Sequence, residues 1–317
     1  MEEKQKLILY VSPSGKDSWS GRLPQPNRTK TDGPFATITG ARNAIRKLKR
    51  KSECKMPITV IVRGGTYYLQ NTIIFTPCDS GTKKSPITYT TYQGERVILS
   101  GGRKITNSWI HYKDKIMVCS IPEVKKEKWK FRQLFINGKR QVRARIPNKG
   151  FYYVARYTTP QEKTKPKEKT SLIFKKGDIK RWYNFNEVEV IIFHSWDESR
   201  LLISKFDEST GKVIFACPSN FPFFWWGLPI RYYIENVLEG LDSPGEWYLD
   251  FNTGDLYFWP EEKIKLEEAE IIAPFLKRII YFKGDLKKKK YVKYINFVGF
   301  TFSHTDWKLP KKGYPGN

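Results

Sequence analysis

The chain has 317 residues, of which 39% are hydrophobic, enough for one large domain or two ordinary ones with a real core. It carries 57 Lys and Arg against 32 Asp and Glu, a formal net charge of +25. Such a charge suits an anionic glycan, a nucleic acid or an acidic protein, and the plain alternative is a Lys-rich solvated surface. No RNP-type aromatic motif and no helix-turn-helix pattern is present, so nucleic acid is the weaker interpretation.

The four cysteines include no CxxC pair and no Cys/His cluster: Cys54, Cys78, Cys119 and Cys217. Zinc is therefore not expected, a chain of this size needs no disulfide framework, and we expect no metal and no cofactor. The N-terminus opens with acidic residues, and its apolar run at 7–11 is too short for a signal peptide or a membrane span. As written, the chain is expected to be cytoplasmic and to have no membrane partner; it would be extracellular if a leader had been removed.

The first periodic segments predict one strand and one helix. Residues 7–11 form an apolar run typical of a short strand. Residues 35–51 place apolar side chains at helical spacing, namely Ile38, Ala41, Ala44, Ile45 and Leu48. Thr37 is the expected N-cap, and the basic residues of 46–51 suit the C-terminal end of the helix dipole. We expect this helix to cover one end of a core of stacked strands, whose edges would otherwise be open.

A series of short β-branched and aromatic runs follows, separated by Gly, Pro, Asp and Ser: 58–69, 73–75, 86–92 and 97–102. No crossover helices lie between them, which excludes a doubly wound α/β sheet. Short strands with glycine corners favour a right-handed solenoid, and a β-sandwich stays open as the competing all-β interpretation. The RGGT sequence at 63–66 lacks the ending of a phosphate loop and is better explained as a tight corner.

From about 103 to 270 the spacing becomes irregular and six of the ten Trp fall within 182–259. Strand-like runs recur, and Asn137-Gly138 and 252–254 predict hairpin turns. The polar segment 161–170 is expected to be an exposed loop. We therefore predict an antiparallel, sandwich-like insert domain.

Residues 291–307, YVKYINFVGFTFSHTDW, are the most regular stretch of the chain. Ile295 and Phe297 alternate with polar or small neighbours, and Phe300 and Phe302 resume the alternation after Gly299. A glycine between two short alternating runs predicts a bend from one strand into the next. This pattern is typical of one coil of a parallel β-helix.

Eight segments of the chain, in order, resemble those of one known group; among them are YVSPSGKDSWSG, DGPFATITGARNAIR, FRQLFINGKRQVRARIPN and FVGFTFSHTDW. The chain resembles the N-terminal part of right-handed parallel β-helix proteins of the glycoside hydrolase family 141 type, within the pectin-lyase-like fold. The resemblance implies an N-terminal cap and first coils over 1–106, a β-rich insert over 107–270 and resumed coils over 271–317. It also implies an oligo- or polysaccharide partner and hydrolysis of plant cell-wall glycans, including xylan and fucosylated pectic side chains.

Proteins of this type continue for several coils beyond the HTDW sequence. The catalytic carboxylates of the family are expected on those later coils, beyond Asn317, so none is assigned here. The resemblance therefore implies a C-terminally truncated chain that is inactive alone. A solenoid without its far coils would expose a stacking face, so self-association through the uncapped end is expected.

Candidate binding residues lie at two places. After the last predicted strand, Asp306 stands between His304 and Trp307 in a sequence that could hold a sugar, with the indole face on its C–H groups. The alternative is an Asp that caps a turn, with Trp307 in the core. In IIFHSWDES, His194 and Trp196 are expected on one side of a strand, as the rim of a sugar site or as a buried strand end.

Two further features lie in the predicted insert. Arg231 and Glu235 alternate onto one face of a predicted strand, where they could form a structural ion pair or hold sugar hydroxyls. PFFWWG at 222–227 could be an aromatic platform or insert core. Three functions stay open: part of a glycoside hydrolase, a non-catalytic glycan-binding protein, or a basic protein that binds polyanions, including nucleic acid.

Overall fold

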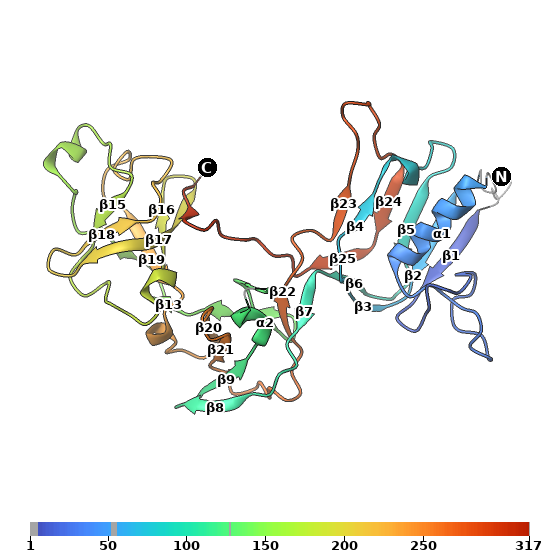
Figure 1. Ribbon diagram of the computed structural model, residues 1–317, viewed down its shortest axis with the longest axis horizontal. Helices are drawn as coiled ribbons and strands as arrows, with labels where there is room; N and C mark the ends of the chain where they lie inside the picture. The colour runs from blue at the N-terminus through green and yellow to red at the C-terminus, as the bar shows by residue number, and fades with distance from the viewer. Residues whose placement is uncertain (1–5, 52–55, 127, 317) are drawn as a thin grey trace. The chain divides into compact units, whose positions relative to one another are not determined.

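The computed structural model describes residues 6–51, 56–126 and 128–316, so Cys54 and the first five residues lie outside it. The chain is mainly β, as predicted, and divides into two compact units (Figure 1). Unit 1 consists of Met1–Arg103 and Pro274–Asp306, and unit 2 of Lys104–Ala273 and Trp307–Asn317. In the described ranges, no helix is long and apolar enough to cross a membrane.

Unit 1 is built from short parallel strands and one long helix, α1 (Ile38–Arg50). The strands are β1 (Leu7–Val11), β2 (Ile58–Val62), β3 (Gly65–Tyr68), β4 (Ile73–Phe75), β5 (Ile87–Thr91), β6 (Val97–Ser100), β23 (Ile280–Phe282), β24 (Ile295–Val298) and β25 (Phe300–Ser303). They form three parallel sheets within the described residues, with the orders β1-β2-β5-β24, β3-β6-β25 and β4-β23. β1 and β2 share a sheet, and from β2 on each successive strand of unit 1 enters the next sheet, so each sheet stacks residues from distant segments.

The chain of unit 1 is interrupted between β6 and β23 and then resumes the same stack. β24 pairs with β5 in the register Ile295 to Ile87, and β23 pairs with β4 (Figure 1). Where the chain leaves and returns, the carbonyl oxygen of Gly101 accepts hydrogen bonds from the backbone N–H of Phe275 (3.0 Å) and of Leu276 (2.7 Å). The interruption therefore falls between two strands of a single turn of the stack.

The predicted bend at Gly299 is confirmed. Gly299 joins β24 to β25 with φ at +84°, a conformation that glycine adopts without steric cost. A Cβ atom at this position would lie 2.6 Å from the Thr91 Oγ1 atom, which is closer than van der Waals contact allows. The corner thus requires glycine for two separate reasons.

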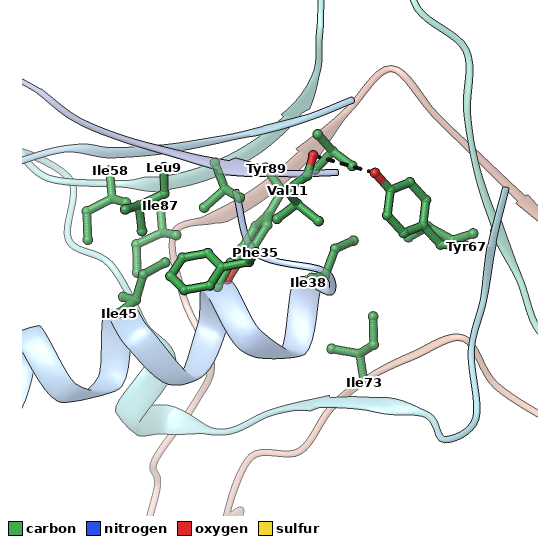
Figure 2. Close-up of a cluster of buried hydrophobic side chains, with 14 of the residues drawn as sticks. Leu9, Val11, Phe35, Ile38, Ile45, Ile58, Tyr67, Ile73, Ile87 and Tyr89 are labelled. Atoms are coloured by element: carbon green, nitrogen blue, oxygen red, sulfur yellow. Dashed lines mark hydrogen bonds between the residues drawn. The ribbon is translucent and has the colours of Figure 1, made fainter. Parts of the chain in front are cut away.

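The core of unit 1 follows from the alternation of its strands. Inward side chains such as Leu9, Val60 and Tyr89 are at most 1% exposed, and Ile38 and Ile45 of α1 face them (Figure 2). The helix begins three residues later than predicted, and the expected N-cap is confirmed, since the Thr37 hydroxyl accepts a hydrogen bond from the Gly40 N–H (2.9 Å).

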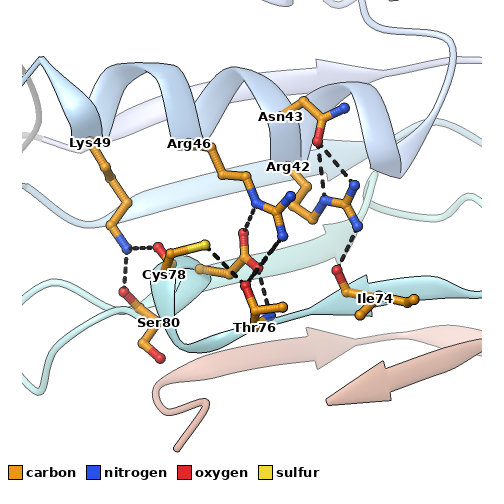
Figure 3. A network of polar contacts seen from close by, with 9 residues as sticks. Arg42, Asn43, Arg46, Lys49, Ile74, Thr76, Cys78 and Ser80 are labelled. Carbon is orange, nitrogen blue, oxygen red and sulfur yellow. Dashed lines mark hydrogen bonds and ion pairs between the residues drawn. The ribbon is translucent and has the colours of Figure 1, made fainter. Parts of the chain in front are cut away.

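A second side of α1 is held by polar contacts to β4 and to the turn η1 (Pro77–Asp79) (Figure 3). Arg42 donates to the Ile74 carbonyl (2.6 Å), and Arg46 forms a two-point ion pair with Asp79. Burial alone would raise the pKa of Asp79, but its hydrogen bonds with Arg46 and Thr76 outweigh burial and hold that pKa below its usual range. These contacts fix the helix against the strands.

Unit 2 is largely antiparallel. A five-stranded sheet has the order β12-β20-β21-β9-β8, in which β12 and β20 are parallel. A larger sheet has the order β13-β19-β16-β17-β18-β15, with β14 on β19 and β26 on β17. A third sheet has the order β11-β10-β22-β7.

The elements of these sheets are β7 (Gly102–Lys104), β8 (Ile110–Lys113), β9 (Ile116–Ser120), β10 (Phe135–Ile136), β11 (Lys139–Arg140), β12 (Val142–Arg143), β13 (Arg145–Ile146), β14 (Tyr152–Tyr153), β15 (Ser171–Ile173), β16 (Glu189–Phe193), β17 (Glu198–Asp207), β18 (Lys212–Phe215), β19 (Arg231–Glu235), β20 (Glu246–Leu249), β21 (Asp255–Phe258), β22 (Ile271–Pro274) and β26 (Gly313–Tyr314). Short helical turns connect them: α2 (Pro122–Lys125), η2 (Pro160–Lys163), η3 (Phe185–Glu187) and η4 (Leu238–Gly240).

Both predicted hairpins of unit 2 are confirmed: Asn137 and Gly138, each with positive φ, join β10 to β11, and 252–254 joins β20 to β21. One expectation needs correction. The segment 161–170 is mostly exposed, but it contains part of η2, and Glu162 is only 8% exposed because its carboxylate accepts the N–H groups of Lys167 and Glu168.

Candidate functional site

A pocket of about 330 Å³ opens in unit 2 where β14 and β16 end and β19 begins. β16 and β19 are antiparallel, so the end of one meets the start of the other, and Tyr153 of β14 pairs with Arg231. The segment after β18 supplies the remaining wall. The lining is mainly aromatic and includes Tyr153, Phe193, His194, Phe223, Trp226 and Arg231.

The PFFWWG segment divides its aromatic side chains between core and surface. Phe223 and Phe224 are each 2% exposed and belong to the core of unit 2. Trp225 and Trp226 are 60% and 36% exposed. The core interpretation therefore holds for Phe223 and Phe224, and this buried pair anchors the exposed Trp225 and Trp226.

His194 and Trp196 come together here, but not by the route predicted. β16 ends at Phe193, so the period-two alternation does not extend to them. They meet instead through Trp226, whose ring centroid lies 6.1 Å from that of His194 and 4.8 Å from that of Trp196. Trp196 is 70% exposed, so its ring stands at the mouth of the aromatic cluster.

His194 is a wall of the pocket and not a base for a nucleophilic serine. Its Nε2 atom lies 2.7 Å from the Ser199 hydroxyl, which itself donates to the Pro315 carbonyl (2.8 Å). The Ser199 oxygen therefore accepts the Nε2–H of the histidine. Burial lowers the pKa of His194, which favours the neutral ring, and Ser199 is fully buried, out of reach of a substrate.

Arg231 places a positive charge at the pocket. Its guanidinium lies over the rings of Phe151 (4.9 Å) and Phe193 (4.8 Å), which hold it by cation–π contact. Among the described residues that line the pocket, none is Asp or Glu. The N–H groups of Arg231 are thus the charged donors available to a ligand here.

Glu235 has a different environment from Arg231. It lies 3.3 Å from Arg200 and 3.8 Å from Arg143, inside an ion network that also holds Glu189. Glu189 is bound by Arg132 and Arg143. Burial would raise the pKa of Glu189, but the two guanidinium charges outweigh it and lower that pKa to about 2. Glu235 therefore belongs to the interior of unit 2 and does not line the pocket.

The three candidate residues near the end of the chain fall in different units. His304 and Asp306 belong to unit 1, where the His304 Nδ1 atom lies 2.9 Å from the Ser100 hydroxyl and the Asp306 N–H donates to the Leu276 carbonyl. Trp307 belongs to unit 2 and is 48% exposed, with its ring against Tyr314 (5.6 Å) and the Arg132 guanidinium over it (5.9 Å). Each is thus fixed by contacts within its own unit.

Two carboxyl groups of unit 2 have a strongly raised pKa. Burial, reinforced by the nearby Asp250, raises the pKa of Glu187 to about 7, and burial raises that of Glu246 to about 7. A general acid needs such a pKa, but neither residue lines the pocket. In the described part of the chain, no group of three or more His, Cys, Asp or Glu could hold a metal ion.

Sequence reasoning missed Tyr153 and Phe193 as pocket residues. Both come from ordinary strand-like runs, and only the pairing of β14 and β16 with β19 brings them to the pocket. The one local signal was the density of aromatic residues in this part of the chain.

Comparisons with known proteins point to glycoside hydrolases. Residues 114–261 match the family model described as "GH141 insertion domain". A solved structure titled "Glycoside hydrolase" is similar to 97% of this chain, with 27% sequence identity and a TM-score of 0.78. The match covers 52% of that chain, so the present chain spans about half the length of the structure it matches.

A second solved structure, titled "The complex structure of XylC with xylose", is similar at a TM-score of 0.44 and 16% identity, covering 96% of this chain and 36% of that one. That likeness is too low to support an argument. A comparison with curated proteins gave no match. The resemblance stated from the sequence is therefore confirmed in its coarser form: an insertion domain of the GH141 type and a glycoside hydrolase neighbour.

Proposed function

We propose that this chain is part of a carbohydrate-active protein and that unit 2 binds a plant cell-wall glycan, such as xylan or a pectic side chain, at the aromatic pocket. The observation that carries the proposal is that the exposed indole of Trp226 and the Arg231 guanidinium line one pocket, with the indole of Trp196 packed against that of Trp226. Flat aromatic faces suit the C–H faces of sugar rings, and a guanidinium donates to hydroxyl groups. A volume of about 330 Å³ is within the usual range of ligand pockets.

The proposal is one of binding and not of catalysis at this pocket. Glycoside hydrolysis ordinarily needs two carboxylates roughly 5–9.5 Å apart. The pocket lining supplies none within the described residues, and the carboxyl groups of raised pKa lie elsewhere in unit 2. Hydrolysis by the whole protein would require carboxylates outside this pocket.

We further propose that unit 1 is part of a right-handed parallel β-helix. Its strands enter three parallel sheets in turn, as the coils of such a fold do. Crossovers between parallel strands of one sheet are right-handed in about 98% of cases, which supports the handedness. In this proposal, unit 2 is a domain inserted within one coil.

Isothermal titration of the whole chain with xylo-oligosaccharides and with neutral pectic side-chain oligosaccharides tests the binding. We expect Trp226→Ala to weaken binding at least about tenfold, because Trp226 lines the pocket and its loss removes an aromatic anchor. Tyr112→Ala is the matched control, because Tyr112 is an exposed aromatic residue of unit 2 (48%) on β8 and does not line the pocket. Absence of binding at millimolar sugar, or equal affinities of Trp226→Ala and the parent, would overturn the proposal.

A further inference from the structure

The basic side chains of α1 divide into two sets that point to different neighbours. Arg42, Arg46 and Lys49 contact β4 and η1 (Figure 3). The helical spacing places a second set on another face, where Lys47, Arg50 and Lys51 are exposed. The first set stabilises the packing of α1 against β4 and η1. These contacts do not account for the second set.

The second set lines a groove of about 690 Å³ between α1 and the loop that follows β1. We call it the cap groove. Its polar and aromatic lining includes Trp19, Arg22, Asn43, Lys47, Arg50 and Lys51, and its floor is apolar. Trp19 is half-buried, with Lys16 over its ring at 5.3 Å.

The cap groove has an excess of positive charge. Four of its lining side chains are cationic, and Asp17 is the acidic one. The Asp17 carboxylate already accepts hydrogen bonds from the N–H groups of Ala36 and Thr37 and from the Thr37 hydroxyl. The helix C-terminus contributes about half a negative charge, which is less than the combined charge of Arg22, Lys47 and Arg50. Within the described part of the chain, Arg22, Lys47 and Arg50 form no ion pair.

The loop wall of the cap groove is held in place. The Asp32 carboxylate accepts hydrogen bonds from the Ser20 N–H (2.8 Å) and hydroxyl (2.7 Å), and the Gly21 N–H donates to the Gly33 carbonyl (3.0 Å). A wall fixed in this way lowers the ordering cost of binding. The groove therefore combines a preformed shape with a field that attracts anions.

We propose that the cap groove binds an acidic glycan, a chain of sugar rings that carry carboxylates. Arg22, Lys47 and Arg50 pair with the carboxylates, Trp19 offers a flat face to a sugar ring, and the Asn43 amide meets hydroxyl groups. The choice of a glycan over another polyanion rests on the proposed function of the chain. The site itself is separate from the aromatic pocket, because it lies within unit 1.

The test compares ligands of matched length on the whole chain by isothermal titration: an oligogalacturonate, a neutral xylo-oligosaccharide and a single-stranded oligonucleotide. The variant Lys47→Glu with Arg50→Glu reverses two charges in the groove. The matched control, Lys287→Glu with Lys289→Glu, makes the same change of net charge in an exposed loop of unit 1. We expect the groove variant alone to weaken oligogalacturonate binding at least about tenfold, and about 0.5 M NaCl to weaken binding by the parent.

Equal losses in both double variants, or no oligogalacturonate binding by the parent, would overturn the proposal. Tighter binding of the oligonucleotide, lost in the groove variant, would assign the groove to nucleic acid instead. If the double variant fails to fold, Arg22→Glu in the exposed loop provides the same comparison. Xylo-oligosaccharide binding reports on the aromatic pocket, so a failure of either site is seen separately.

Discussion

The two units bury different kinds of side chain. The core of unit 1 is a set of stacked apolar residues. Among the described residues of unit 1, one charged side chain is buried, that of Asp79, which pairs with Arg46 of α1. Unit 2 buries several charged groups: Arg143, Glu162, Glu189, Glu246 and Asp250. In unit 1, one repeated alternation of inward and outward side chains determines how the strands pair. The short, irregular strands of unit 2 need other interactions to fix their pairing. We expect the ion network of unit 2 to provide some of these interactions.

The substitution with the largest expected effect on this difference between the units is Glu189→Gln. It would leave Arg132 and Arg143 without their buried carboxylate and lower the free energy of unfolding of unit 2 by about 3–5 kcal/mol. Urea unfolding followed by tryptophan fluorescence measures it, because Trp19 is the only tryptophan of unit 1. Glu208→Gln, at an exposed turn of the same unit, is the control.

The pH dependence of unit 2 offers a second measurement of the same group. The folded-state pKa of Glu189, about 2, lies below the ordinary value of 4.5. Its contribution to stability is therefore present above pH 4.5 and is lost as the pH falls toward 2. The Glu189→Gln variant should lack this acid-dependent loss, and an unchanged acid transition would contradict the role given to the network.

In unit 1, the corresponding sensitive position is the Gly299 corner between β24 and β25, and not a buried charged residue. Gly299→Val would impose positive φ on a β-branched residue and bring its side chain against Thr91, at a cost of about 1–3 kcal/mol. Hydrogen exchange of the amides in β24 and β25 should rise. Gly94→Val is the matched control, since Gly94 also has positive φ but open space around it. Equal costs at both positions would show that the contact with Thr91 is unimportant.

The smallest expected effect concerns Glu187. Because burial raises its folded-state pKa to about 7, its contribution favours folding below pH 4.5 and is lost as the pH rises through 7. The urea midpoint of the parent should therefore fall between about pH 5 and about pH 8, and Glu187→Gln, which resembles the protonated acid, should reduce that fall. An identical fall in the variant would exclude Glu187 as its source.

The difference between the two units also explains which structural features the sequence could predict. In unit 1, the strand at 7–11, the strand at 73–75, the Thr37 cap and the Gly299 bend were all predicted, because each depends on neighbouring residues. The predicted helical range 35–51 nevertheless included residues before this cap, where the Asp17 carboxylate of a distant loop accepts the Ala36 and Thr37 N–H groups. Local pattern does not contain such contacts.

In unit 2, less could be predicted. Alternation wrongly extended β16 to His194 and Trp196. His194 and Arg231 still line one pocket, because β16 pairs with β19, and Trp196 packs on the pocket residue Trp226. The ion network holds Glu235 elsewhere. The residue types indicated the chemistry of the site. Which residues line the pocket, however, depends on contacts between distant segments of the chain.

The pairing of β24 with β5 has a consequence for how the chain folds. Ile295 follows its partner Ile87 by 208 residues (295 minus 87). During synthesis at about 5–20 residues per second, the free edge of β5 would wait roughly 10–40 s for β24 to emerge. Contacts so distant in sequence slow folding, and a parallel edge left open for that time can pair with another chain. The 170 residues of Lys104–Ala273 that interrupt the stack therefore lengthen the period during which the open edge of β5 can aggregate.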